Sequence, residues 1–290
     1  MKPEYREFLR VGEEAGARYA LVAPRKLPSG LTGSRLGHQA GSSLEFREHR
    51  DYQPGDDLRR IDWGVYGRSD KLTVKLYQDE VLPHVDIVMD GSRSMVLTDT
   101  VKGKATLGLA AVLASASRQA GFSHCAWVTD EGCQRVVNGT STPSLWDDLK
   151  FEDQGNPLLS FSHQPPTWRP QSIRVLISDL LWMGDPLQFL GYFADRSTHI
   201  LVLQVLAKQD MLPPPKGYIE LVDSESGEVQ DVYIDAVAQQ RYTDAFSRHQ
   251  QHWMQAARQV GAMFSTVVAE DIVDNWHLDD LVASEILQVQ

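Results

Sequence analysis

The stretch Val85-Asp86-Ile87-Val88-Met89-Asp90-Gly91-Ser92-Arg93-Ser94 decides the fold that the sequence predicts. Its first five residues are mostly apolar, as expected for a strand buried inside a sheet. The carboxylate of Asp90 and the hydroxyls of Ser92 and Ser94 follow at alternate positions, where the strand should end. In open α/β sheets, binding sites form beyond the carboxyl ends of the strands. Oxygen ligands suit hard cations, so the sequence predicts a site for Mg²⁺, or for Mn²⁺ or Ca²⁺.

Strands and helices alternate after this motif. Apolar runs predict strands at residues 85–89, 124–129, 134–137, 173–178, 200–206 and 263–268. Helical periodicity, with a glycine closing two of the segments, predicts helices at residues 104–120, 186–195 and 236–260. A hairpin is expected near residues 218–234, before the last helix. This order implies a mostly parallel sheet with helices on both faces, so the predicted class is α/β.

The first 80 residues have a different pattern. A short helix is expected at residues 4–14, followed by an arm rich in Gly and Pro as far as residue 40. Residues 44–77 then alternate β-favouring pieces with turns, and we expect them to extend or cap the main sheet. The predicted domains are therefore an N-terminal arm with a β-rich extension, residues 1–80, and a main domain, residues 81–290.

A longer motif precedes the predicted buried strand, and it is followed by Leu72-Thr73-Val74-Lys75 and Glu80. It reads Phe46-Arg47-Glu48-His49-Arg50-Asp51-Tyr52-Gln53-Pro54-Gly55-Asp56-Asp57-Leu58-Arg59-Arg60-Ile61-Asp62-Trp63. Its Pro-Gly pair fits a turn, and its acids are spaced to pair with its arginines. One interpretation is a turn locked against the main sheet by ion pairs and by Trp63. The alternative is a partner-docking surface formed by Arg50, Asp56, Asp57, Arg59, Asp62 and Trp63.

The two motifs together carry a family resemblance. The pattern Asp-x-Ser-x-Ser after a strand resembles the metal-ion-dependent adhesion motif of von Willebrand factor A domains. With the longer motif, residues 41–207 resemble a bacterial family, domain of unknown function fifty-eight, which joins a von Willebrand A-like domain to this preceding signature. The resemblance implies a Rossmann-like von Willebrand A fold. It also implies a MoxR-type AAA+ ATPase as a partner, because members are commonly associated with these enzymes.

The same resemblance suggests which residues would hold the metal. In similar proteins the ligands are the first Asp and two Ser, a Thr from a later loop, and an Asp after a central strand. Here these positions correspond to Asp90, Ser92, Ser94 and Asp179, and Asn156 stands where Thr is usual. An amide oxygen also binds such ions, so the site is either altered but intact or vestigial. Alternatively, Asp90 ends a strand, a serine caps a turn and Asp179 caps a helix.

Charge and composition narrow the classes of function. Residues 1–80 hold 14 Lys and Arg against 13 Asp and Glu, whereas residues 81–290 hold 14 against 26. A nucleic-acid-binding protein normally shows a basic face, so nucleic acid is not expected as a partner. Every apolar run is shorter than the roughly 20 residues that span a bilayer. We therefore expect no membrane span and a soluble, cytoplasmic protein.

Three functions follow from these patterns. The first is a non-enzymatic protein-interaction or adaptor module, which works with a MoxR-type AAA+ ATPase and a client protein in assembly or maturation. The second is a metal-dependent hydrolase that uses Asp90, Asp179 and Asp99. The third is an assembly protein with a vestigial metal site, in which the surface from Arg50 to Trp63 alone binds partners. Common nucleotide-binding, zinc-protease and serine-hydrolase motifs are missing from the sequence, so an enzyme is not favoured and no cofactor other than the metal is expected.

Overall fold

The computed structural model describes residues 3–22, 45–78, 83–97, 99–129, 132–151, 157, 160–161, 166–223 and 227–290. The chain divides into two compact units. Unit 1 contains Met1–Arg25 and Pro83–Gln290, and unit 2 contains Lys26–Leu82. The division differs from the expected boundary at residue 80, because the N-terminal helix belongs to the main unit.

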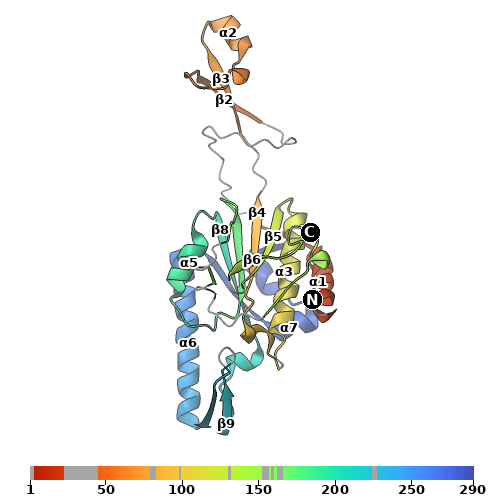
Figure 1. Ribbon diagram of the computed structural model, residues 1–290, viewed down its shortest axis with the longest axis vertical. Helices are drawn as coiled ribbons and strands as arrows, with labels where there is room; N and C mark the ends of the chain where they lie inside the picture. The colour runs from red at the N-terminus through yellow and green to blue at the C-terminus, as the bar shows by residue number, and fades with distance from the viewer. Residues whose placement is uncertain are drawn as a thin grey trace. The chain divides into compact units, whose positions relative to one another are not determined.

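Unit 1 is built on one six-stranded sheet, with the strand order β11-β8-β7-β4-β5-β6. All neighbouring strands are parallel except β5 and β6, which are antiparallel. The sheet confirms the predicted α/β class, and its strands lie close to the predicted ranges (Figure 1). The strands are β4 (His84–Met89), β5 (Ser123–Thr129), β6 (Cys133–Arg135), β7 (Ile173–Ser178), β8 (His199–Leu206) and β11 (Met263–Val268).

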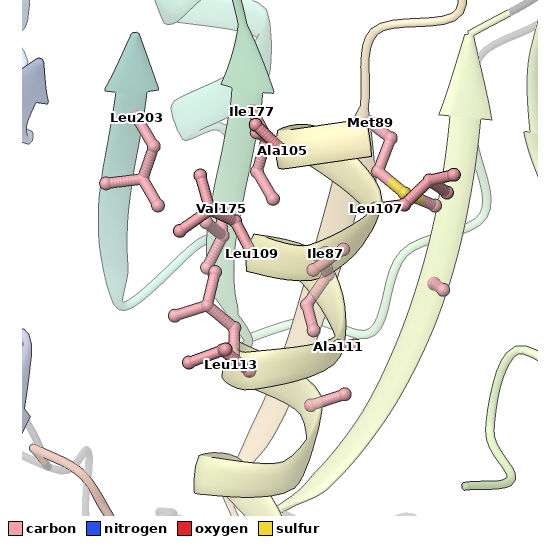
Figure 2. Close-up of a cluster of buried hydrophobic side chains, with 14 of the residues drawn as sticks. Ile87, Met89, Ala105, Leu107, Leu109, Ala111, Leu113, Val175, Ile177 and Leu203 are labelled. Atoms are coloured by element: carbon pink, nitrogen blue, oxygen red, sulfur yellow. The ribbon is translucent and has the colours of Figure 1, made fainter. Parts of the chain in front are cut away.

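Helices cover both faces of this sheet, so unit 1 has three layers (Figure 1). Successive side chains of a strand point to opposite faces. On β4, Ile87 and Met89 belong to the core on the α3 side, whereas Val88 belongs to the opposite core. Figure 2 shows side chains of α3 and of the central strands packed together. The helices are α3 (Lys102–Gln119), α1 (Pro3–Gly16) and α7 (Ala269–Asn275) on one side, and α5 (Pro186–Ala194) and α6 (Ala236–Gln259) on the other.

Shorter elements complete unit 1. β9 (Gly217–Val222) and β10 (Val229–Ile234) form the expected hairpin before α6. The β1 strand (Tyr19–Leu21) pairs antiparallel with β12 (Leu287–Val289), which the sequence did not suggest. The other short elements are α8 (Asp279–Ala283), η2 (Arg93–Val96), η3 (Pro143–Leu145) and η4 (Lys208–Met211), the last three being 3₁₀ turns.

Unit 2 has a small sheet of its own. β2 (Glu45–Asp51) and β3 (Thr73–Gln78) pair antiparallel, and η1 (Leu58–Arg60) and α2 (Trp63–Ser69) lie between them in the chain. The expectation that this region extends the main sheet is wrong for the described strands, because β2 and β3 form a two-stranded sheet that is separate from the six-stranded one. The backbone groups that β2 and β3 turn toward each other are paired within the hairpin, so this pairing does not involve an edge of the larger sheet.

Close packing holds α1 on α3. Gly12 lies so close to α3 that a Cβ built on it would be 2.6 Å from the carbonyl oxygen of Gly108. Gly16 approaches the backbone of Val112 in the same way. Two glycines one helical turn apart therefore let the two helix backbones meet, and this contact fixes the N-terminal helix to unit 1.

We expect Gly12→Ala to destabilise unit 1 by about 1–3 kcal/mol, because the added methyl must push two helix backbones apart. The control is Gly191→Ala on α5, where a Cβ would meet nothing within 4 Å. That variant should gain about 0.5–1 kcal/mol, since alanine restricts the unfolded chain and favours helix. Urea unfolding of both variants measures the difference, and equal effects would contradict the packing argument.

Candidate functional site

Polar residues meet where β4 and β7 end. The backbone N–H of Asp90 donates to the carbonyl of Ile177 at 2.9 Å, so the two strand ends are adjacent. The Asp90 carboxylate accepts from the backbone N–H of Ser92 and from the hydroxyl of Ser178. The hydroxyls of Ser92 and Ser94 lie 3.0 Å apart. The structure therefore brings three predicted residues together, and it adds Ser178, which sequence reasoning missed.

Gly91 is required by the close approach of β5. A Cβ on this residue would lie 1.9 Å from the carbonyl oxygen of Thr129, which no side chain tolerates. The N–H of Gly91 donates to the Thr129 hydroxyl at 2.9 Å. The glycine thus directs the chain from β4 into η2 and places Ser92 and Ser94 beside Asp90.

Lys102, the first residue of α3, pairs with two acids that follow β7 and β8. Its ammonium Nζ lies 2.8 Å from Oδ2 of Asp179 and 3.1 Å from Oδ2 of Asp210 in η4. The Lys102 side chain is only 2% exposed and that of Asp179 only 1%. Sequence reasoning missed Lys102 and Asp210, although a lysine opening an otherwise apolar helix was a visible signal. We name Asp90, Lys102, Asp179 and Asp210 the Lys102 cluster.

Burial and mutual charge shift the pKa values in this cluster. Burial, and then the negative charge of Asp179, raise the pKa of Asp90 to about 6. Burial alone would lower the pKa of Lys102, but the charges of Asp179 and Asp210 outweigh it and the pKa is raised. Lys102 is therefore an ammonium ion at neutral pH, inside a site that holds three carboxyl groups.

The residues fit the predicted divalent ion poorly. Asp90, Ser92 and Ser94 offer oxygens of the expected kind, but Asp179 already contacts a fixed positive charge. The fifth predicted ligand, Asn156, lies outside the described residues. Among the residues that the structure describes, no group of three or more His, Cys, Asp or Glu side chains is arranged to hold a metal. The metal site stays a prediction.

In unit 2 the predicted acids support local structure. The Asp56 carboxylate accepts a hydrogen bond from the backbone N–H of Gln53. One guanidinium nitrogen of Arg50 donates to both of its oxygens, at 2.8 and 2.9 Å. Asp57 caps η1 and pairs with Arg59 at 2.9 Å. The backbone N–H of Gln53 and then Arg50 lower the pKa of Asp56, and Arg59 lowers that of Asp57 to about 2. Both acids are therefore charged and already paired at neutral pH.

Asp62 has the most contacts of these acids. Its carboxylate accepts from the backbone N–H groups of Gly64 and Val65, which caps α2. The same carboxylate lies 2.9 Å from His49 and 3.3 Å from Lys75, which come from the two strands of the hairpin. The hydrogen bond from His49 is the largest cause of its lowered pKa. Asp62 thus ties α2 to both strands.

Trp63 does not lock the turn, which corrects one interpretation of the motif. Its side chain is 62% exposed, and its ring meets that of Tyr66 edge to face at 6.1 Å. Leu58 is 60% exposed and Arg59 has 80% of its side chain exposed. Sequence reasoning missed Leu58 and Tyr66. We name these four exposed residues the Trp63 surface.

Comparison with known families agrees with the resemblance to domain of unknown function fifty-eight. Residues 48–142 match the family model described as "Protein of unknown function DUF58". Over these residues the chain is similar to that family. The matched region contains the motif of unit 2 from Glu48 onward and the Asp90 motif of unit 1.

Relatives and solved structures are distant. Uncharacterized proteins of Mycobacterium tuberculosis and Mycobacterium bovis are 26% identical over 260 residues, covering 83% of this chain and 80% of theirs. An aerotolerance-related membrane protein from Bacteroides fragilis aligns with a TM-score of 0.41 and 14% identity, over 69% of this chain and 99% of its own. BatB from Bacteroides thetaiotaomicron, described as a conserved hypothetical protein, has a TM-score of 0.33 and 11% identity, over 70% and 98%. These scores are too low to transfer any property.

The helices of the described residues were compared with what a membrane span requires. None of those in the described part of the chain combines the length and the apolar character that crossing a bilayer requires.

We expect Ser178→Ala to destabilise unit 1 by about 1–3 kcal/mol, because the Oδ2 atom of the buried Asp90 carboxylate loses its donor and the Leu180 N–H loses its acceptor. The matched control is Ser172→Ala. Ser172 precedes β7, is equally buried, and its hydroxyl has no hydrogen-bond partner in the described structure. Thermal or urea unfolding should show little change for the control, and a similar loss in both variants would contradict this role of Ser178.

We expect Asp62→Ala to loosen α2, because the helix loses its N-cap. Amide hydrogen exchange at Gly64 and Val65 should quicken, whereas the control Asp51→Ala, an exposed acid on β2, should leave it unchanged. Because the folded pKa of Asp62 is lowered, its contribution is present above about pH 4 and is lost as the pH falls further. Exchange that is unaltered at pH 7 in Asp62→Ala would refute the role.

Proposed function

We propose that this protein is a non-enzymatic interaction module whose Trp63 surface binds a partner protein. The observation that carries the proposal is the exposure of Leu58, Trp63 and Tyr66 together within nine residues of unit 2. Tryptophan is usually largely buried in a folded protein, and aromatic side chains with arginine are enriched at the centres of interfaces. A short segment that exposes all of these features suits docking better than it suits a structural role.

The acids of unit 2 support this proposal by what they do inside it. Asp56, Asp57 and Asp62 hold the turn and cap both helical elements, so they fix the backbone that carries the exposed residues. A binding surface gains affinity when it is rigid before the partner arrives. Of the residues predicted for docking, we therefore assign partner contact to Arg59 and Trp63, and a supporting role to Arg50 and the three acids.

The partner that we propose is a MoxR-type AAA+ ATPase, together with a client protein in assembly or maturation. This part of the proposal rests on the resemblance to the family, whose members are commonly associated with such ATPases. The proposed location is the cytoplasm, where an ATPase of this class has access to ATP. A divalent ion at Asp90 stays a prediction and is not required for this function.

The hydrolase alternative has less support. Asp90 and Asp179 are both buried, and Lys102 already contacts Asp179. Asp99, in contrast, is exposed. A hydrolase needs its carboxylates within hydrogen-bonding reach of a substrate. Nothing in the geometry of these three acids favours that arrangement over an interaction module.

We expect Trp63→Ser and Arg59→Glu each to weaken binding to the purified MoxR-type ATPase of the same genome at least tenfold, about 1.4 kcal/mol. Loss of a large aromatic contact or reversal of a charge removes interface energy without touching the core of unit 1. The measurement is the dissociation constant of each variant for the immobilised ATPase, and circular dichroism confirms that the variants are folded. Tyr192→Ser, an exposed tyrosine on α5, is the control and should bind normally.

The same experiment separates the two candidate surfaces. Asp90→Asn should leave the affinity unchanged, because the proposed contact lies in unit 2. Normal binding by both Trp63→Ser and Arg59→Glu would refute the proposal, and binding lost only in Asp90→Asn would move the partner site to the strand ends of unit 1.

A further inference from the structure

We propose that the ammonium group of Lys102 is the permanent cation of the site at the strand ends, in the place where the motif predicts a divalent metal ion. The inference goes beyond the proposed function and does not depend on it, because it concerns the charge balance of unit 1 alone. The positive charge that a metal ion would bring to the adhesion-type motif is then supplied by the Lys102 side chain.

The first support is the contact geometry. The Nζ atom of Lys102 bridges Asp179, which follows β7, and Asp210, which follows β8, at 2.8 and 3.1 Å. Asp210 belongs to no predicted ligand set, so the lysine has its own second acid. The Lys102 ammonium group thereby links the C-terminal ends of two neighbouring strands, β7 and β8, to the start of α3.

The second support is that the acid oxygens are occupied by protein donors. Oδ1 of Asp179 accepts the backbone N–H of Leu181 at 3.0 Å, and Oδ2 holds Lys102. Oδ2 of Asp210 also accepts the N–H of Ala207 at 2.9 Å. Asp90 accepts from Ser92 and Ser178, one at each oxygen. Buried carboxylates that are satisfied in this way do not need a metal to stabilise them.

The third support is electrostatic exclusion. Ions such as Mg²⁺ and Ca²⁺ sit about 2.0–2.6 Å from their carboxylate oxygens. An ion held by Asp179 would therefore lie next to a buried ammonium that cannot move into water, since Lys102 is only 2% exposed. Two cations in contact inside a low-dielectric site repel each other strongly. A divalent ion and the Lys102 ammonium group therefore cannot both contact the Asp179 carboxylate.

The position of Lys102 on its helix shows that the carboxylates hold it there. A cation is disfavoured at the N-terminus of a helix, because the helix dipole is positive at that end. Burying an ammonium adds a further cost unless it is paired. Lys102 opens α3 and is buried, so Asp179 and Asp210 must offset both costs. The fold depends on this pairing, as a metalloprotein depends on its ion.

The test combines metal titration with a charge-removal series. The wild-type protein, titrated with MgCl₂, MnCl₂ and CaCl₂ by calorimetry, should show no binding, and neither these ions nor EDTA should shift its melting temperature. Lys102→Met should lower the melting temperature by roughly 5–15 °C, because two carboxylates lose their counter-ion. The double variant Lys102→Met with Asp179→Asn should recover part of this loss.

The matched control is Lys104→Met. Lys104 lies two residues further along α3, is about one-third exposed, and pairs with Glu4 at 3.0 Å near the surface. Its removal should change the melting temperature by no more than about 2 °C, because surface ion pairs contribute little.

Two results would overturn the proposal. One is binding of a divalent ion by the wild-type protein that disappears in Asp90→Ala. The other is a Lys102→Met variant that melts like Lys104→Met. If Lys102→Met does not fold, the titration of the wild-type protein and of Asp90→Ala decides: no Asp90-dependent binding and no effect of EDTA support the proposal, and binding that disappears in Asp90→Ala refutes it.

Discussion

The rest of unit 1 depends on the burial of α3 along most of its length. Every residue from Lys102 to Ser117 except Lys104 is buried, so this helix needs cover on all sides. The sheet covers one side, through residues such as Ile87 and Val175, as Figure 2 shows. Helices α1 and α7 cover the other, and the glycines of α1 make the close approach possible. Since apolar burial is the main driving force of folding, this arrangement fixes the layers of the unit.

Burial of α3 also explains the chemistry at the strand ends. A helix that is buried as far as its first residue carries Lys102 into the interior, and a buried ammonium requires partners. The turns after β7 and β8 supply Asp179 and Asp210. Asp90 then shares a buried site with other carboxyl groups, and its pKa is raised to about 6 mainly by burial. The packing of α3 in the core therefore determines which charged groups meet at the strand ends.

Unit 2 divides its residues in the opposite way. Asp56, Asp57 and Asp62 take part in local hydrogen bonds, whereas Trp63 and Tyr66 are exposed. Asp62 contacts both strands of the hairpin and caps α2, while the adjacent Trp63 is left to solvent. The motif therefore contains a structural part and a surface part in neighbouring positions. The proposed function uses only the surface part.

The sequence by itself determined the α/β class, the six strands, and the meeting of Asp90, Ser92 and Ser94, because these follow from local patterns of apolar and polar residues. Strand β7 was predicted at the residues where it lies, and α3 to within two residues at its start. Only the tertiary structure decided that β1 pairs with β12, that β2 and β3 form a separate sheet, and that Lys102 meets Asp179 and Asp210. Those contacts join residues far apart in the chain, where spacing carries no signal. Which side chain neutralises a buried acid depends on which turns pack together in three dimensions.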